Sequence, residues 1–343
     1  MPEKMLEKMK ILCALNGVSG SEEEVRDYIA GHAEKHTADV QVDVMGNVIV
    51  SKKGKKTPAQ KLVLCAHMDE VGVIITGITD DGYLRFAKGG SLDGRVILGK
   101  AVVIGRNKVQ GIIGTKAIHL VKTNEQENPV EIEDMYIDIG AKDKSEAEKK
   151  VSLGDAGAFD EDIREFGDGF IKAKAIDDRF GCAVLMDLIE SELPIDCTFV
   201  FTVQEEVGLR GAFTAAYKTA PDITLIVEGT TAADLPSVPE TKKVCKPGNG
   251  PVIPFMDGGA IYNKEVRRIL TELADKNNIP WQTKTYIAGA TDGSVFQKAH
   301  SGVKTVGIAA AIRNLHSHTC VGKISDMEAV QKLIWLFLEK MGE

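Results

Sequence analysis

The sequence has no long hydrophobic run and no excess of positive charge, and each absence excludes a class of protein. No uninterrupted apolar stretch approaches the roughly 18 residues of a membrane-spanning helix, so we expect none. The opening MPEKMLEKMK is charged and amphipathic, unlike a secretory signal, which predicts a cytoplasmic protein. With 42 Lys and Arg against 50 Asp and Glu, the net charge of −8 argues against nucleic acid or anionic membrane as partners.

Paired cysteine motifs are also missing. The six cysteines lie far apart, with no Cys-x-x-Cys pair. Cys65, Cys182 and Cys197 stand inside apolar runs, which predicts reduced thiols packed as small hydrophobic groups. We therefore expect neither a disulfide framework nor a cysteine-based zinc site.

The 343 residues leave room for two domains of ordinary size. Strand-like and helix-like patterns alternate in residues 1–70 and 164–343, which predicts an α/β domain with a mostly parallel, doubly wound sheet. Residues 71–163 instead carry glycines at short intervals between Val- and Ile-rich pieces, a texture typical of a small β-barrel. We therefore expect a barrel domain inserted into the α/β domain.

Individual elements of the α/β domain can also be placed. The near-continuous apolar run KLVLCAH, at 61–67, is typical of a strand buried on both faces of a sheet. Further strands are expected at 197–203, 223–229 and 304–310. Ser21 with Glu24 forms a capping box, which predicts the start of a helix that ends near Ala33. Ser325 with Glu328 forms a second capping box, which predicts the start of the C-terminal helix.

Histidine and acidic residues follow three of the predicted strands. His67 and Asp69 follow the first, Glu205 and Glu206 the second, and Glu228 the third. Ligands of open α/β sheets bind just beyond the carboxyl ends of the strands. These side chains should therefore share one rim of the sheet.

Asp177, Asp178 and His316 can join the same rim, from the start of a helix and from the end of a fourth strand. A His with a carboxylate suits a zinc-type ion, and one Asp shared between two such sets makes a two-metal site. Two ions about 3.5–4 Å apart would polarise a carbonyl and lower the pKa of a bridging water. Without cations, so many carboxylates in one cleft would repel each other. The pattern thus predicts a dinuclear metal centre.

Seven pieces of the sequence resemble family forty-two of the metallopeptidases, the glutamyl/leucyl aminopeptidases that assemble as tetrahedral TET particles. They occur in the family's order and cover nearly the whole chain: GVSGSEEE at 17–24, AHMDEVG at 66–72, AIDDRFG at 175–181, QEEVGLRGA at 204–212, VEGTTAADLP at 227–236, GATDGS at 289–294 and RNLHS at 313–317. The resemblance implies a zinc-peptidase-like sheet and a cytoplasmic enzyme that acts on short peptides. It also implies that the inserted domain helps to build a homo-oligomer, a tetrahedral dodecamer.

The resemblance also implies a role for each residue of the rim. One of two divalent ions (Zn or Co, with Mn also suitable) would be held by His67 and Glu228, the other by Glu206 and His316, with Asp177 bridging both. Glu205 would be the general base for the attacking water. Asp69 would accept a hydrogen bond from the His67 ring and fix its tautomer. In relatives the peptide bond after the bridging Asp is cis.

Several of these positions also have simpler explanations. Asp177 and Asp178 could cap a helix, where acidic residues favour the dipole. We leave Asp178 as a supporting residue. His318 could replace His316 as the ligand, although the family's Arg-x-x-His-Ser pattern favours His316.

Two residues are weaker candidates for substrate binding. Arg313 could bind substrate or pair with a carboxylate, and Asp292 could position substrate or lie in a plain turn. The sequence does not indicate which N-terminal residue is preferred. It departs from the common family pattern at Glu228 (often Asp), Asn314 (often Tyr) and His318 (often Pro), which puts side-chain specificity in doubt.

The leading hypothesis is metal-dependent removal of the N-terminal residue from short peptides. An N-acyl amino acid or peptide deacylase on the same metal centre is the nearest alternative. A glycoside hydrolase, as in endoglucanase-type labels, would leave the histidines unexplained, and only Trp281 and Trp335 could stack on sugar rings. A non-enzymatic metal-binding scaffold would not explain a spare Glu205.

Overall fold

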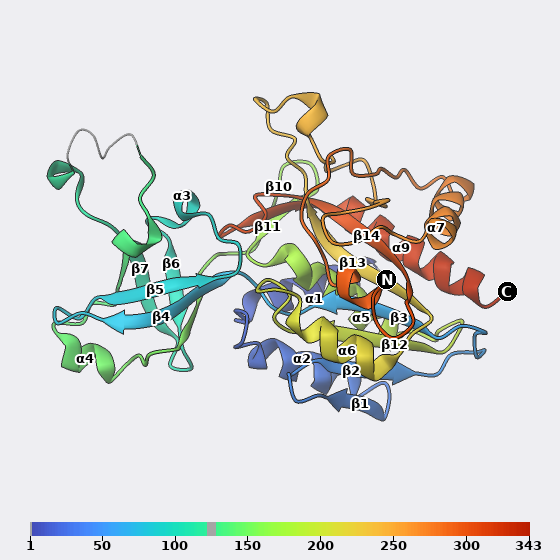
Figure 1. The fold of residues 1–343 in the computed structure, drawn as a ribbon, viewed down its shortest axis with the longest axis horizontal. Helices are drawn as coiled ribbons and strands as arrows, with labels where there is room; N and C mark the ends of the chain where they lie inside the picture. Colours follow the sequence, from blue (N-terminus) through green and yellow to red (C-terminus); the bar gives the residue numbers. More distant parts are fainter. Residues whose placement is uncertain (1, 122–127) are drawn as a thin grey trace.

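The computed structural model describes residues 2–121 and 128–343. It contains a large sheet covered by helices and, beside it, a closed barrel (Figure 1). The sheet strands are β1 (Asp39–Val42), β2 (Val48–Lys52), β3 (Leu62–His67), β10 (Arg164–Phe166), β11 (Phe170–Ala173), β12 (Cys197–Thr202), β13 (Ile223–Thr231), β14 (Lys304–Arg313) and β15 (Cys320–Lys323). The barrel strands are β4 (Gly72–Ile78), β5 (Leu84–Gly89), β6 (Ala101–Ile104), β7 (Val109–Gly114), β8 (Tyr136–Asp138) and β9 (Ala156–Phe159).

The α-helices of the described residues occur in both parts of the chain. They are α1 (Pro2–Ala14), α2 (Glu23–Ala33), α3 (Gly94–Ile97), α4 (Lys144–Glu148), α5 (Ile176–Glu190), α6 (Arg210–Thr219), α7 (Lys264–Lys276), α8 (Gly293–Phe296) and α9 (Ile324–Met341). Short 3-10 turns lie at Ile118–Leu120, Ile132–Asp134 and Glu240–Lys242. Among the described helices, none has the length and apolar character needed to cross a bilayer.

The centre of the large sheet is parallel. Its order is β1-β2-β12-β3-β13-β14-β15-β11-β10, and β12, β3, β13 and β14 run parallel to one another. The outer strands pair antiparallel. This confirms the predicted α/β fold with its parallel core and a small barrel, and it shows that antiparallel strands extend the sheet at both edges.

Alternate residues of β3 explain why its sequence is apolar throughout. Leu62, Leu64 and Ala66 pack into the core formed with α1, α2, α5, α7 and α9. Val63 and Cys65 point to the other face, against α6 and α8. Because successive side chains of a strand point to opposite faces, a strand covered on both sides is apolar at every position. All six cysteines are buried and free, which confirms the prediction made for Cys65, Cys182 and Cys197.

The barrel has its own core and joins the α/β part through two short connections (Figure 1). β3 leads into β4, and the chain returns after β9 to β10, which pairs with β11 in the large sheet. The order β4-β5-β8-β7-β6-β9 closes on itself through the β4–β9 pair. The glycine-rich texture of this region therefore corresponds to strands that pair only among themselves.

Both predicted capping boxes are wrong. Helix α2 begins at Glu23 rather than after Ser21, and Glu22 occupies its N-cap position without a side-chain cap. The Glu22 carboxylate instead accepts from the Gly20 and Gln204 amides. Helix α9 begins at Ile324, directly after β15, so Ser325 lies inside its first turn. The segment at Gln204 therefore engages the residue at the start of α2, and strand β15 leads directly into α9.

Candidate metal centre

The predicted rim residues come together at the carboxyl ends of the four parallel strands. His67 is the last residue of β3 and pairs in register with Thr202, the last residue of β12. Glu205 and Glu206 follow within four residues of Thr202. Strand β13 continues three residues past Glu228, beyond the predicted end, and His316 follows β14.

Asp177 lies between two His–Glu pairs. Its Oδ1 is 3.7 Å from Nε2 of His67, which is in turn 3.1 Å from Oε1 of Glu228. Its Oδ2 is 4.0 Å from Nε2 of His316, which is 3.3 Å from Oε2 of Glu206. The two oxygens of one carboxylate thus face two separate donor sets, which is the arrangement that a pair of bridged cations requires.

The backbone around Asp177 is shaped to deliver this carboxylate. The Asp177–Asp178 peptide is cis, as the family resemblance implies, and both residues have non-helical dihedral angles at the start of α5. The Gly229 amide donates to Oδ1 of Asp177 at 3.1 Å. A Cβ at position 229 would lie 2.5 Å from the same oxygen, so only glycine fits there.

The donors fit divalent cations for two reasons. They are His and carboxylate groups, the ligands of zinc-type ions. Oε2 of Glu228, an oxygen of one of these donors, is buried and has no hydrogen-bond partner. Buried charged oxygens without partners are costly, and a bound cation would satisfy them.

Burial and mutual repulsion shift the pKa values of the centre. Burial raises the pKa of Glu228 to about 8, although His67 opposes this. Burial also raises the pKa values of Glu205 and Glu206 well above their ordinary value. Burial acts to lower the pKa of His67, but attraction to Glu228 and hydrogen bonds to Asp177 and Asp69 raise it well above normal. Protons thus compete with cations for the carboxylate and imidazole groups of the centre.

Asp69 holds both glutamates of the β12–α6 segment by their backbone. Its Oδ1 accepts from the Glu205 amide at 2.9 Å, and its Oδ2 accepts from the Glu206 amide at 3.1 Å. Ser19 Oγ donates to Oδ2 at 2.6 Å. Nδ1 of His67 lies 3.4 Å from Oδ1 and 3.1 Å from the Asp69 backbone carbonyl. The Asp69 carboxylate therefore orients Glu205 and Glu206, while the backbone carbonyl of Asp69, and not the carboxylate that was predicted, forms the hydrogen bond with the His67 ring.

Sequence reasoning missed the partners that support this segment. Glu22 Oε1 accepts from the Gln204 amide at 3.1 Å, so carboxylates hold three successive amides at 204–206. Buried Glu70 forms an ion pair with Lys174 at 2.7 Å and with Arg179 at 3.2 Å, which ties the chain after β3 to the start of α5. The available signal was the acidic stretch GVSGSEEE together with Glu70, which directly follows Asp69.

Replacing Asp69 with asparagine should lower metal affinity or peptidase activity about 10–100-fold, the usual effect of losing a residue that orients ligands. An Asn amide group would present N–H to one of the two backbone amides that now donate to Asp69. Metal titration and steady-state kinetics would measure the effect. Ser19→Ala is the matched milder variant, since it removes one hydrogen bond and leaves both amides paired. Wild-type metal affinity and wild-type activity in Asp69→Asn would contradict this role.

The two neighbouring histidines separate clearly in space. His316 has a left-handed backbone with φ of 55°, which turns its ring toward Glu206 and Asp177. His318 points to the barrel side, where its Nε2 lies 3.9 Å from Glu161 and its ring meets the edge of Phe159. Of the two, only His316 lies against the carboxylates of the rim.

Arg313 and Asp292 both have protein partners. Arg313 makes two hydrogen bonds to Asp234, at 2.9 and 2.6 Å, and lies over the Phe170 ring. Asp292 is 2% exposed and accepts from Thr202 Oγ1 at 2.5 Å, below the rim. Arg313 thus contacts a carboxylate and Asp292 contacts a strand residue of the sheet, and their roles toward substrate stay predictions.

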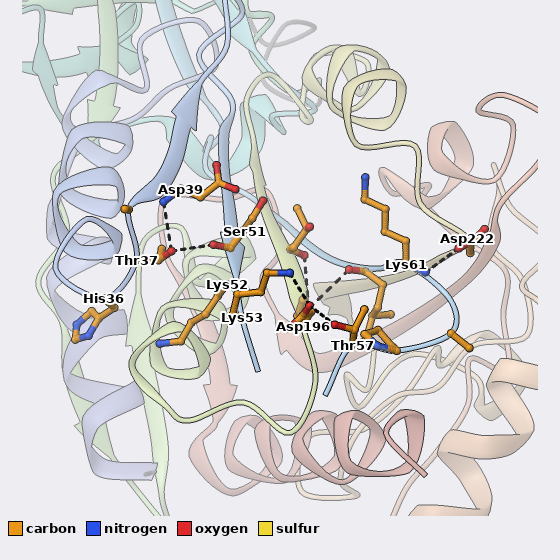
Figure 2. Close-up of a pocket in the computed structure, with 16 residues that line it drawn as sticks. His36, Thr37, Asp39, Ser51, Lys52, Lys53, Thr57, Lys61, Asp196 and Asp222 are labelled. Carbon is orange, nitrogen blue, oxygen red and sulfur yellow. Dashed lines mark hydrogen bonds and ion pairs between the residues drawn. The ribbon is translucent and has the colours of Figure 1, made fainter. Parts of the chain in front are cut away.

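A large hollow lies at the other end of the strands (Figure 2). It has a volume of about 800 Å³, and Leu62 and Cys197, the first residues of β3 and β12, line it. Several of its polar groups are already engaged: Asp196 accepts from Lys53 and Thr57, and Asp222 accepts from the Lys61 amide. The concentration of buried metal-type donors, and not the size of the hollow, identifies the functional end of the sheet.

A parallel α/β sheet with His and carboxylate donors at its carboxyl edge fits the class of metal-dependent hydrolases. The chain belongs to the M42 glutamyl aminopeptidase family, whose sequence pattern matches residues 46–333. A protein of Acetivibrio thermocellus described as "Putative aminopeptidase" is 37% identical over 334 residues, 97% of this chain and 98% of the relative. The chain is thus an aminopeptidase, a peptide-bond hydrolase, from a metallopeptidase family.

Solved structures agree over almost the full length. An aminopeptidase of Desulfurococcus kamchatkensis has a TM-score of 0.93 at 35% identity, covering 99% of this chain and 95% of its own. The TET1 peptidase of Pyrococcus horikoshii, which can assemble into a tetrahedron or a large octahedral shell, has a TM-score of 0.84 at 34% identity, covering 96% and 98%. A Thermotoga maritima protein described as an endoglucanase has a TM-score of 0.81 at 34% identity, covering 97% of each chain.

Proposed function

We propose that this aminopeptidase removes the N-terminal residue of short peptides at a two-metal centre. His67 and Glu228 hold one ion, Glu206 and His316 hold the other, and Asp177 bridges them; Zn²⁺ and Co²⁺ suit these donors best, and Mn²⁺ also suits them. The observation that carries the proposal is the pair of Asp177 oxygens facing two His–Glu sets. When bound, two such ions polarise the scissile carbonyl and make water a better nucleophile.

Glu205 is the general base in this proposal. Neighbouring residues of an extended segment point to opposite sides, so Glu206 can face the ions while Glu205 faces the substrate. Asp69 fixes the amides of both residues. Burial raises the pKa of the Glu205 carboxyl, and a general base works best when its pKa lies near the pH at which the enzyme operates. Glu205 takes a proton from the attacking water and passes it to the leaving amine.

Glu228 has a second task, which is to align the substrate. It is buried beside His67 at one end of the donor cluster, and one of its oxygens has no hydrogen-bond partner. A carboxylate in this position attracts the free α-ammonium of a peptide and so places the first peptide bond at the centre. This requirement for a free amine distinguishes an aminopeptidase from a deacylase.

The test is hydrolysis of aminoacyl-p-nitroanilides with acidic, basic and aliphatic residues, beside an N-acetylated control. We expect turnover only where the amine is free, and the ranking within the panel gives the preferred residue. Turnover of the N-acetylated compound at an equal or higher rate would instead favour the deacylase. A glycoside hydrolase is disfavoured by the site itself, because Trp281 follows α7 and Trp335 lies on α9, outside the cluster.

We also propose a cytoplasmic homo-oligomer in which the barrel, the inserted domain at 71–163, joins subunits into a tetrahedral dodecamer. The support is the assembly of the Pyrococcus horikoshii peptidase and a set of apolar side chains exposed on the barrel: Leu98, Ile112, Ile118, Leu120 and Leu153. Exposed apolar groups in one region mark interaction surfaces. Six buried free thiols suit a reducing compartment. Light scattering should give about twelve times the 37.1 kDa chain mass, and a monomer would contradict the proposal.

A further inference from the structure

A second group of metal-type donors lies away from the rim, between α2 and the end of α5. His32 is in the last turn of α2, which ends at Ala33, and His36 lies in the turn that follows; their ring centroids are 5.1 Å apart. Glu190 is the last residue of α5. One donor atom from each of the three side chains lies within 4.8 Å of the others.

One ring nitrogen of His32 faces Glu190 without a hydrogen bond. This nitrogen, Nε2, is buried and lies 3.3 Å from Oε1 of Glu190. Burial lowers the pKa of His32, against the attraction of Glu190. A metal ligand must be the neutral imidazole, so a lowered pKa favours coordination.

The simpler explanation of Glu190 is that it anchors Lys8. Lys8 Nζ is 3.0 Å from Oε1 of Glu190, and Lys4 Nζ is 3.9 Å from Oε2. Lys8 Nζ is also 3.0 Å from Oδ1 of Asp187, which is buried. Lys8 can therefore keep Asp187 when a cation takes over Glu190, so the ion pair does not block the site. It explains neither the missing hydrogen bond of His32 Nε2 nor the adjacent His36.

We propose that His32, His36 and Glu190 form an additional site for a divalent transition-metal ion of the zinc type, separate from the reaction centre. Two His, one at the end of α2 and one in the turn that follows it, with a carboxylate are a donor set that zinc accepts. His36 is exposed and lies at the side of the hollow in Figure 2, away from Asp196 and Lys53, so an ion can reach the site and keep water as a further ligand.

The site is independent of the rim because α5 separates them. Asp177 stands at the start of this helix and Glu190 at its end. At 1.5 Å per residue the separation is roughly 20 Å, too far for a shared ion. An ion at this site joins α2 to α5 and stabilises the folded chain, because the unfolded chain does not hold the three donors together.

The experiment counts zinc bound by the full-length protein. Chelator-treated wild type, His36→Gln and Glu190→Gln are equilibrated with Zn²⁺, passed through a desalting column and assayed by mass spectrometry for metal per chain. His119→Gln is the matched control, since His119 is also an exposed histidine but lies on the barrel. We expect His36→Gln and Glu190→Gln to hold about one ion less than wild type and His119→Gln.

A second readout separates this site from the reaction centre. Peptidase activity should be unchanged in His36→Gln. In wild type, Zn²⁺ added after activity has reached its maximum should raise Tm further, and this further rise should be lost in His36→Gln. His36 is exposed, so its replacement should not impair folding. Equal zinc content and an equal Tm rise in wild type and His36→Gln would overturn the proposal. The zinc count does not depend on which substrate the enzyme prefers, so failure of the proposed function would be visible separately.

Discussion

Replacing Glu205 with glutamine should lower kcat about 10²–10⁴-fold, the usual contribution of a general base, while bound metal stays at the wild-type level. The amide has nearly the same shape but cannot take a proton from water. The backbone at 205 stays in place because Asp69 accepts from its N–H, which the substitution leaves intact. Steady-state kinetics on the best p-nitroanilide of the panel, together with metal analysis, would measure the effect.

Glu206→Gln is the informative contrast to Glu205→Gln. The Oε2 atom of Glu206 faces the His316 ring at 3.3 Å, so this neighbouring variant should lose metal as well as activity. Full activity in Glu205→Gln would place the base elsewhere. Loss of metal in Glu205→Gln would instead make Glu205 a ligand.

Removing the divalent ions should abolish peptidase activity, by at least about 10³-fold. A metal contributes several kcal/mol of transition-state stabilisation, and each 1.36 kcal/mol is a factor of ten in rate. We expect Zn²⁺ or Co²⁺ to restore turnover after chelation and dialysis. Full activity of the chelated enzyme would overturn the metal-dependent mechanism. If no divalent ion restores activity, the proposed choice of Zn²⁺ or Co²⁺ is wrong.

The pH dependence of metal binding provides a separate check. Glu228 has an ordinary pKa of 4.5 and a folded-state pKa of about 8. Its contribution to the stability of the metal-free chain is therefore full below pH 4.5 and is lost as pH rises through 8. Because a cation must displace that proton, the increase in Tm caused by Zn²⁺ should grow from pH 5 to pH 8. An increase that stays constant over this range would contradict a protonated, cation-free Glu228.

Most of the fold and the rim could be predicted because their signals are local. A strand buried on both faces must be apolar throughout, so β3 and β13 could be located from their composition. The carboxyl ends of parallel strands share one edge, so the residues that follow these strands could be grouped from their positions along the chain. The family resemblance then supplied a role for each donor.

Local signals failed where a distant segment competed for the same group. The sequence pattern made Ser21 and Glu24 a capping box, but the Glu22 carboxylate at the start of the helix instead holds the Gln204 amide, 182 residues away. The choice between His316 and His318 depends on a left-handed turn that aims one ring at Glu206. Neither outcome can be read from spacing along the chain.

The order of amino acids is enough to specify the class of the fold, the edge of the sheet where the chemistry lies and the chemical type of its donors. How those donors are held follows from the folded chain. Folding brings Asp69 under two successive amides and turns the two oxygens of Asp177 toward different His–Glu pairs. This division arises because composition and periodicity report burial along one segment, whereas the hydrogen-bond partners of buried charges come from whichever segments fold against them.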